Sequence, residues 1–316
     1  MTPSYFFRRL FLMALTLLCI SAIIFAITGI LPGNLAQVIL GEYATPEALQ
    51  ALHQKMGLDR PYYVQYFSWL GNALQGDMGT ALSMEQPITE VILFRLKNSA
   101  VIAFFSLTIV TCIAVPLGVW AGLHRNSLPD RLIQLSSYIG ISIPEFATAS
   151  LLIILLAGPV FSIFPSTGFV PMSENPLKSL YHMALPVLTL VVVLIAHIMR
   201  QTRSEMIQVL QTDYIRSARL KGLPERQVVY KHALRNALLP TVTVLALDVG
   251  YLIGSIVVVE EVFAYPGIGR LVVFAVQARD IPLLQSSVLV IASVYCIVNF
   301  LADIAYSFLN PKIRYK

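Results

Sequence analysis

The sequence predicts an all-α polytopic membrane protein with six transmembrane helices and both termini on the cytoplasmic side. Three observations carry this prediction: the composition, six apolar runs of spanning length, and the distribution of Lys and Arg. Apolar residues make up 57% and charged residues 12% of the 316 residues, and the mean hydropathy is +0.73. Soluble domains contain about 25% charged residues. The composition therefore excludes an ordinary cytosolic enzyme, a disordered chain and a nucleic-acid binder, despite a net charge of +5.

Each predicted span contains the roughly 20 mostly apolar residues that a bilayer requires. In chain order the predicted spans are residues 10–31, 100–123, 133–161, 180–199, 238–259 and 283–308. The first follows Arg8 and Arg9, as the core of a secretory signal would. The core of a secretory signal has about 7–15 apolar residues and is followed by an A-x-A cleavage site. This span is longer and no such site follows, so we expect a retained membrane anchor.

Lys and Arg are concentrated in alternate connections. With the N-terminus in the cytoplasm, 15 of the 22 basic residues lie inside, eight of them between residues 200 and 239. This bias sets the orientation, and an even number of spans brings the C-terminus inside as well. We expect residues 1–99 to form an N-terminal helix with an extracytoplasmic loop. Residues 100–316 then form the transmembrane core, with a cytoplasmic loop at 200–239.

The first outer loop, residues 32–99, contains two helical signals. Thr45 followed by Pro46 is typical of a helix start, and Gly57 is expected to end that helix. An aromatic cluster then follows, formed by Tyr62, Tyr63, Tyr66, Phe67 and Trp69. Tyr and Trp favour the level of the lipid headgroups. The cluster therefore predicts either a helix lying on the outer leaflet or a docking surface for an external partner.

The inner loop between the fourth and fifth spans has a helical pattern. Ile207, Leu210, Tyr214 and Ala218 recur at helical spacing. Gly222 can end this helix, and Pro224 can begin another. A basic loop can bind anionic lipid. The length and pattern of this one favour a helix–Gly–helix knob that contacts a cytoplasmic protein.

Residues 212–222, TDYIRSARLKG, resemble the cytoplasmic-loop signature of ABC importer permeases, Glu-Ala-Ala-x-x-x-Gly. Arg216, Ser217 and Ala218 take the Glu-Ala-Ala places, and Gly222 takes the place of the Gly. Residues 232–240, HALRNALLP, close the signature. The Arg in place of Glu and the longer gap to the Pro resemble the peptide and nickel importer branch, type B permeases. Further resemblance lies in segments 57–61, 76–79, 259–270, 279–282 and 309–314.

This resemblance implies the type I ABC importer permease fold and a permease that receives its substrate from an external solute-binding protein. The substrate it favours is a di- or oligopeptide, with a nickel chelate or glutathione as alternatives. It implies a second homologous permease subunit in a heterodimer, two ATP-binding subunits that carry ATP and Mg, and the bacterial inner membrane. The chain has no G-x-x-x-x-G-K-[ST] phosphate loop, so we expect it to bind no cofactor.

Two other classes of protein remain as alternatives. A secondary transporter usually contains internal repeats, and none is clear between the two halves of this chain. A membrane enzyme needs an acid/base or nucleophile–base constellation, and none stands out. We therefore predict no catalytic residues in this chain.

The coupling segment, which we define as residues 214–222, is the predicted contact with the ATPase subunits. Small side chains at Ser217 and Ala218 let a helix sit deep in a groove, and Gly222 lets the chain reverse sharply. The residues assigned to it are Tyr214, Arg216, Ser217, Ala218, Arg219, Lys221 and Gly222.

Charged residues within spans face protein or water, because burying them in lipid is costly. Asp248, near Gly250 and Gly254, is either pore-lining or a helix-to-helix hydrogen bonder. Glu145 follows Pro144, which can break a span where it lines a cavity. These two are the predicted path residues.

The remaining charged positions near the membrane have less specific predictions. We expect Asp303 to pair with a basic residue of the tail and His197 to be interfacial. No His or Cys lies at ligand spacing from His197, so we predict no metal site. Glu260 and Glu261 either meet a binding protein at the outer mouth or belong to a structural cap.

Overall fold

The computed structural model describes residues 3–30, 45 and 59–309; these form helices joined by turns and loops, and their only β-structure is an isolated bridge between Thr80 and Pro87. The predicted helix start at Thr45 and Pro46, and the resembling segments at 57–58 and 310–314, lie wholly or partly outside the described residues. The helices are α1 (Pro3–Ile30), α4 (Tyr62–Leu74), α5 (Ile88–Leu123), α6 (Leu128–Ser142), α7 (Glu145–Leu152), η1 (Ile153–Ala157), α8 (Pro176–Leu210), α9 (Asp213–Leu220), α10 (Glu225–Gln227), η2 (Val228–Ala233), α11 (Leu234–Val262), α12 (Ile268–Gln277) and α13 (Ile281–Leu309).

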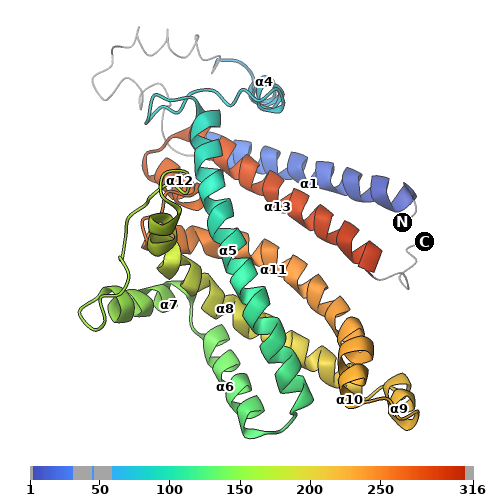
Figure 1. Ribbon diagram of the computed structural model, residues 1–316. Coiled ribbons are helices and arrows are strands. Elements are labelled where there is room, and N and C mark those ends of the chain that lie inside the picture. Colours follow the sequence, from blue (N-terminus) through green and yellow to red (C-terminus); the bar gives the residue numbers. More distant parts are fainter. Residues whose placement is uncertain (1–2, 31–44, 46–58, 310–316) are drawn as a thin grey trace. The chain divides into compact units, whose positions relative to one another are not determined.

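Five helices are long and apolar enough to cross a membrane, and a bent pair of helices makes a sixth candidate span. The predicted all-α protein with six spans is therefore confirmed. The third span is not one straight helix over residues 133–161, as the sequence led us to expect. α6 and α7 meet at 106°, because Pro144 forces Ile143 into an extended conformation that ends α6. Figure 1 shows α6 and α7 on either side of this break.

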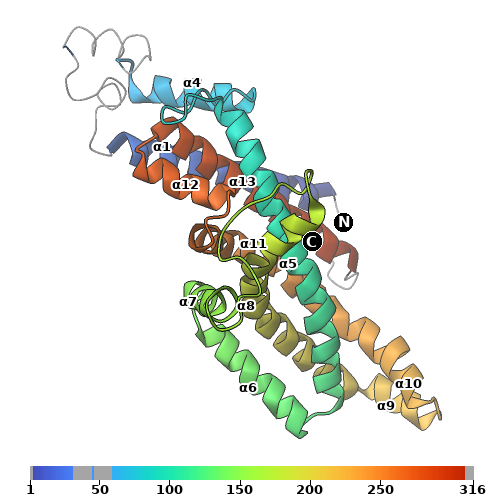
Figure 2. The same ribbon diagram turned by 60° about the vertical axis from the view of Figure 1, so that its left-hand side comes forward.

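The connection between residues 200 and 239 is more helical than predicted. α8 continues past the bilayer-length run to Leu210, and residues 225–262 form one long apolar helical stretch. The expected helix through Ile207 and Ala218 is interrupted after Leu210, where Thr212 precedes α9. Only α9 and the Gly222 turn therefore separate the two long helical stretches. Figure 2 shows α9 next to α10, away from both chain termini.

The chain divides into two compact units. Unit 1 consists mainly of residues 99–265, and unit 2 of residues 6–98 and 266–297. In unit 1, α8 packs against α6, α7 and α11. Its buried side chains, among them Leu190, Leu194 and Ile198, form the core of this unit.

α5 approaches α8 closely at two glycines. A Cβ atom on Gly118 would lie 2.7 Å from the carbonyl oxygen of Met199, and one on Gly122 would lie 2.7 Å from Cβ of Met206. The two glycines are four residues apart and so lie on one face of α5. Small residues at this spacing let two helix backbones come together, so the missing side chains set the distance between α5 and α8.

Unit 2 contains α1, α4, α12 and parts of α5 and α13. Ile88, Ile92, Leu271 and Leu283 belong to its core. Asp280 is buried and accepts hydrogen bonds from the backbone nitrogen of Ser83 at 2.9 Å, its hydroxyl at 2.7 Å, and the nitrogen of Leu283 at 3.1 Å. The side chain therefore caps the start of α13 and ties it to the segment before α5.

Candidate functional site

α9 lies between the two long helices of unit 1 and ends in a tight turn. Asp213 stands in its first turn and Arg219 in its last, where each charge complements the helix dipole. Gly222 follows with φ +75°, a conformation that glycine adopts without steric cost. Pro224 then precedes α10. The predicted helix end at Gly222 and the new start after Pro224 are both confirmed.

The inner face of α9 packs against the chain itself. Ile215 and Ala218 are buried, in a cluster that includes Met206, Val229 and Ala233. The small side chain of Ala218 therefore fits α9 against η2. We expected Ala218 to let the helix enter a partner's groove. In the structure its side chain faces its own core, and a part for it in the coupling contact stays a prediction.

Arg219 forms an ion pair across the Gly222 turn. Its Nη2 atom lies 2.5 Å from Oε1 of Glu225, and its Nε atom lies 3.1 Å from Oε2. This bidentate contact with the carboxylate raises the pKa of the Arg219 guanidinium above its ordinary value. Arg219 thus holds α9 against α10.

Tyr214 links α9 to the following helix. Its hydroxyl accepts a hydrogen bond of 2.9 Å from Nδ2 of Asn236, near the start of α11. Asn236 also donates to the backbone oxygen of His232 at 3.0 Å. The coupling segment is therefore fixed at both ends by polar contacts within the chain, through Tyr214 and Arg219.

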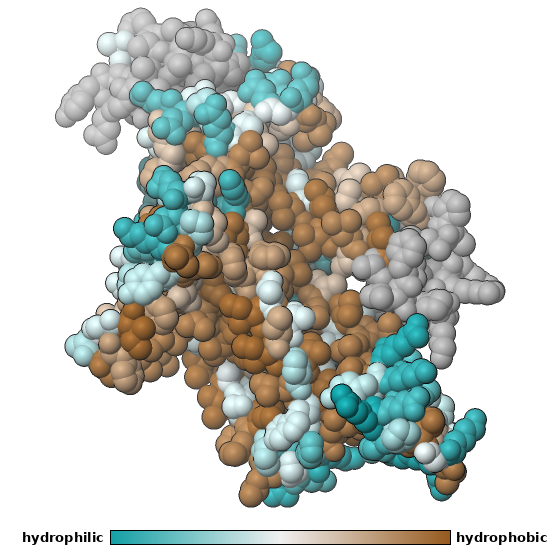
Figure 3. Space-filling model, in the orientation of Figure 1, coloured by the Kyte–Doolittle hydropathy of each residue, from teal (hydrophilic) through white to brown (hydrophobic). Residues whose placement is uncertain are grey.

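The outer face of the coupling segment exposes Arg216, Ser217, Lys221 and Gly222. Leu220 is 81% exposed, and the sequence analysis did not single it out. A pocket of about 490 Å³ lies beside the turn, lined by Pro224, Arg226, Gln227 and Tyr230. Figure 3 shows hydrophilic residues gathered where α9 and α10 lie. This end of unit 1 therefore combines exposed cations with an apolar tip.

Asp130 and Arg203 join the α5–α6 turn to the end of α8. The Nε atom of Arg203 lies 2.5 Å from Oδ1 of Asp130, and its Nη2 atom lies 2.7 Å from Oδ2. Asp130 also accepts from the backbone nitrogen of Asn126 at 2.9 Å. Residues 124–131 and the end of α8 therefore lie together, as the predicted orientation requires of two inside segments.

Asp248 bonds to a neighbouring helix. Its Oδ1 atom lies 2.8 Å from Nδ1 of His197, which connects α11 to α8. The Oδ2 atom of Asp248 is buried and has no hydrogen-bond partner among the described residues. This is the helix-to-helix bond that we gave as one alternative, and it also gives His197 a partner. A place for Asp248 on the path stays a prediction.

Glu145 stands at the break between α6 and α7. Its Oε1 atom accepts a 2.5 Å hydrogen bond from the Tyr251 hydroxyl and a 3.0 Å bond from Ser255. Both donors lie on α11. Glu145 is thus bonded to α11, the helix that carries Asp248, the other predicted path residue, although no described contact joins the two side chains.

Glu260 and Glu261 differ in exposure. Glu260 is fully buried and accepts a hydrogen bond from Ser99, whereas Glu261 is exposed. A contact between Glu260 and an external protein would require an exposed side chain, so this residue fits the alternative of a structural cap. Burial, with the charge of Glu260 nearby, raises the pKa of Tyr265. For Glu261, a contact at the outer mouth stays a prediction.

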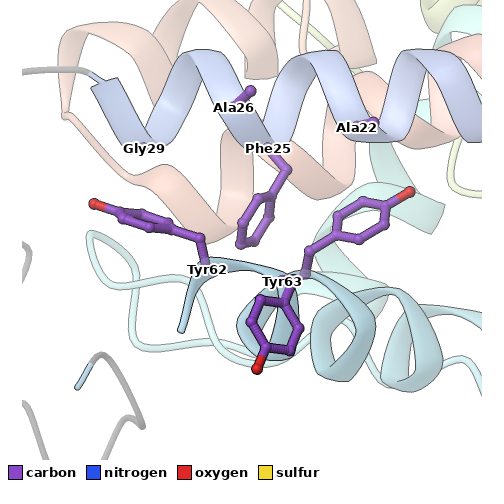
Figure 4. Close-up of a pocket in the computed structure, with 7 residues that line it drawn as sticks. Ala22, Phe25, Ala26, Gly29, Tyr62 and Tyr63 are labelled. Atoms are coloured by element: carbon purple, nitrogen blue, oxygen red, sulfur yellow. The ribbon is translucent and has the colours of Figure 1, made fainter. Parts of the chain in front are cut away.

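The aromatic cluster of the outer loop lies on α4 and packs against α1. Tyr66 contacts the ring of Phe25 and the hydroxyl of Ser21, the latter at 2.8 Å. Figure 4 shows the pocket of about 450 Å³ between the two helices, lined by Ala22, Phe25, Ala26, Gly29, Tyr62, Tyr63 and Tyr66. The choice between an interfacial helix and a docking surface stays a prediction. The basic tail expected to pair with Asp303 lies outside the described residues.

Known families match nearly all of the chain. Residues 114–315 match the family described as binding-protein-dependent transport system inner membrane component, and residues 3–96 match the N-terminal part of such membrane components. The chain is 37% identical over 313 residues to the glutathione transport system permease protein GsiC of Escherichia coli K12, covering 99% of both chains. It is 35% identical over 331 residues to the dipeptide transport system permease protein DppB of Alkalihalophilus pseudofirmus, also with 99% coverage of both.

These matches agree with the observed fold: a helical chain with six candidate spans and a short helix between the spans at residues 176–210 and 225–262. They extend over the whole length of the relatives, so they apply to the entire protein. The chain belongs to the family of binding-protein-dependent transport system inner membrane components and is the permease subunit of an ABC importer.

Proposed function

We propose that this permease carries a peptide-type substrate, either a short peptide or glutathione, across the inner membrane of a bacterial cell. An external solute-binding protein delivers the substrate, and separate ATPase subunits drive its passage. Relatives of 37% and 35% identity are named for glutathione and dipeptide transport, and glutathione is itself a tripeptide. The chain binds no cofactor; ATP and Mg belong to the two ATP-binding subunits, and a second homologous permease completes the heterodimer.

The observation that carries the mechanism is the position of α9 at the exposed end of unit 1. α8 and α11 continue directly into the packed core, so a displacement of α9 is transmitted to the helices that hold Asp248 and Glu145. Residues of the coupling segment divide by role. Arg216, Ser217, Lys221 and Gly222 face the ATPase subunits, whereas Tyr214, Ala218 and Arg219 keep α9 attached to its own chain.

The proposed division of the chain is residues 1–99 for the N-terminal helix with its outer loop and 100–316 for the permease core with the coupling loop at 200–239. The two family matches, at 3–96 and 114–315, support this boundary. A division there allows the outer loop to serve the binding protein while the core serves the ATPases.

The coupling role is tested by Gly222→Asp in the complete complex. Membrane insertion is expected to stay intact, because a Cβ at Gly222 meets no atom within 4 Å. Uptake is expected to fall at least tenfold while ATP hydrolysis persists, since the new carboxylate occupies the surface that faces the ATPase. Gly222→Asn is the matched control, because Asn tolerates positive φ similarly and adds no charge. Uptake by Gly222→Asp at the wild-type rate would contradict the assignment.

The substrate class is tested separately in proteoliposomes that contain all subunits and the binding protein. We expect ATP-dependent uptake of labelled dialanine or labelled glutathione. Uptake of a nickel chelate, with neither dialanine nor glutathione transported, would overturn the peptide-type proposal and leave the coupling role unaffected.

A further inference from the structure

Glu145 carries a negative charge at the bend of a membrane span without a basic partner. Among the described residues it forms no ion pair, and its only side-chain contacts that we observe are with Tyr251 and Ser255. A carboxylate at membrane depth faces protein or water and not lipid, because lipid cannot solvate it. The surface around Glu145 is therefore not a lipid-facing surface of the assembled transporter.

The carboxylate is held in one position by its two donors. Tyr251 and Ser255 both donate to Oε1, and hydrogen bonds to a carboxylate stabilise its charged form. Glu145 also begins α7, where the helix dipole favours a negative charge. These contacts fix and stabilise the charge but do not neutralise it.

A second acceptor lies on the same side of α11. Asp248, Tyr251 and Ser255 follow one another at intervals of three and four residues, which places them on one helix face. Asp248 is nine-tenths buried, and its Oδ2 atom accepts no hydrogen bond from the described residues. Tyr251 itself is 53% exposed. We call this face of α11, together with Glu145 that Tyr251 and Ser255 hold against it, the acidic face. It combines the unpaired charge of Glu145, the free Oδ2 atom of Asp248, whose Oδ1 atom bonds to His197, and an accessible aromatic hydroxyl.

We propose that the acidic face binds the ammonium group of the substrate during its passage, with Glu145 as the principal contact. This rests on the proposed function, because short peptides and glutathione each contain a primary ammonium group. A cation is the complement of the Glu145 carboxylate and of the free Oδ2 atom of Asp248, and Tyr251 adds an aromatic surface that attracts it further. Glu145 then determines which substrates pass the bend, in addition to any selection by the binding protein.

The test uses proteoliposomes with the complete complex and saturating binding protein, and it measures uptake of labelled dialanine and of labelled glutathione. Glu145→Gln is the decisive variant, since its amide oxygen can still accept from Tyr251 and Ser255 while the charge is lost. We expect at least a tenfold lower uptake rate for this variant. Glu145→Asp, which keeps the charge, should stay within about threefold of the wild-type rate.

Two controls separate binding from folding. Tyr251→Phe removes one donor and leaves the charge, so it should lower uptake less than Glu145→Gln does. Glu174→Gln removes an exposed carboxylate before α8 and should stay within twofold of the wild-type rate. Equal uptake by Glu145→Gln and the wild type would overturn the proposal.

Assembly of the complex decides between a substrate and a partner subunit as the occupant. Co-purification of the second permease with Glu145→Gln at wild-type yield is expected. Loss of that subunit would show that Glu145 pairs with a cation of the partner and would overturn the proposal. If the wild type takes up neither dialanine nor glutathione, it is the proposed substrate class that has failed, which is a distinct result.

Discussion

Arg203 on α8 donates hydrogen bonds to both carboxylate oxygens of Asp130 at the start of α6, with N–O distances of 2.5 and 2.7 Å. The Asp130 side chain is 0% exposed. The pair joins two segments that are 73 residues apart in the chain. It therefore fixes the inner end of the bent span against the helix that leads to α9.

Replacing Asp130 by Asn is expected to destabilise the isolated subunit. The Asn is nearly isosteric but leaves a mostly buried guanidinium without its counter-charge, which costs about 3–5 kcal/mol in known cases. The measurement is thermal unfolding of the purified subunit in detergent. The exposed pair of Arg219 and Glu225 provides the control: Glu225→Gln should cost about 0–1 kcal/mol. Equal losses in the two variants would contradict the importance of the buried pair.

Gly118→Val is expected to separate α5 from α8. The new side chain would collide with the backbone oxygen of Met199 and with Thr202, each 2.7 Å from the added Cβ. Overpacking of this kind costs about 1–3 kcal/mol, and it should appear as a lower unfolding temperature. Gly254→Ala, whose Cβ meets no atom within 4 Å, should not lower the unfolding temperature, because Ala favours the helix more than Gly does. A drop for Gly254→Ala of the same size would refute this account of close packing.

Leu220→Ser is expected to weaken the contact with the ATPase subunits without affecting the fold. The side chain is 81% exposed and contributes little to the core of its own chain, and it lies among the exposed residues of the coupling segment. The measurement is co-purification of the ATPase subunits together with the unfolding temperature. Leu177→Ser, equally exposed at the opposite end of α8, should retain the ATPases. Full retention by Leu220→Ser would exclude this residue from the contact.

Asp280→Ala is expected to loosen unit 2. The substitution leaves the nitrogen atoms of Ser83 and Leu283 without their acceptor, and each buried unsatisfied group costs about 1–3 kcal/mol. Limited proteolysis should then cut between residues 75 and 87 faster than in the wild type. Ser83→Ala, which keeps the backbone bond, should have a smaller effect. Unchanged proteolysis in both variants would show that this capping contact does not hold the segment.

The number of spans and the approximate position of each were predictable because hydropathy is a local property. A bilayer demands about 20 apolar residues from each helix, and this demand is met segment by segment. The turn at Gly222 was predictable for a similar reason, since its positive φ reflects the conformational freedom of one residue. The bend at Pro144 was recognised as a possible break, but its angle of 106° depends on what α6 and α7 pack against.

The extent of α8 was not predictable from hydropathy. Residues 200–210 are polar enough to leave the bilayer, yet they continue the helix because Arg, Gln, Glu and Met are good helix formers. Hydropathy indicates where a helix leaves the membrane and not where it ends. The inner loop was therefore expected to begin at residue 200, whereas α8 continues to Leu210.

The sequence by itself determined an all-α membrane protein with six candidate spans, the family of importer permeases, and the place of the coupling segment. Only the tertiary structure decided that Ala218 faces its own core, that Glu260 is buried, that Glu145 bonds to α11 and that Asp248 bonds to α8. The hydrogen-bond partners of Asp248, Glu145 and Glu260 come from segments 51 to 161 positions away. Local patterns report the depth of a residue in the membrane, whereas the direction of its side chain depends on which helices pack together.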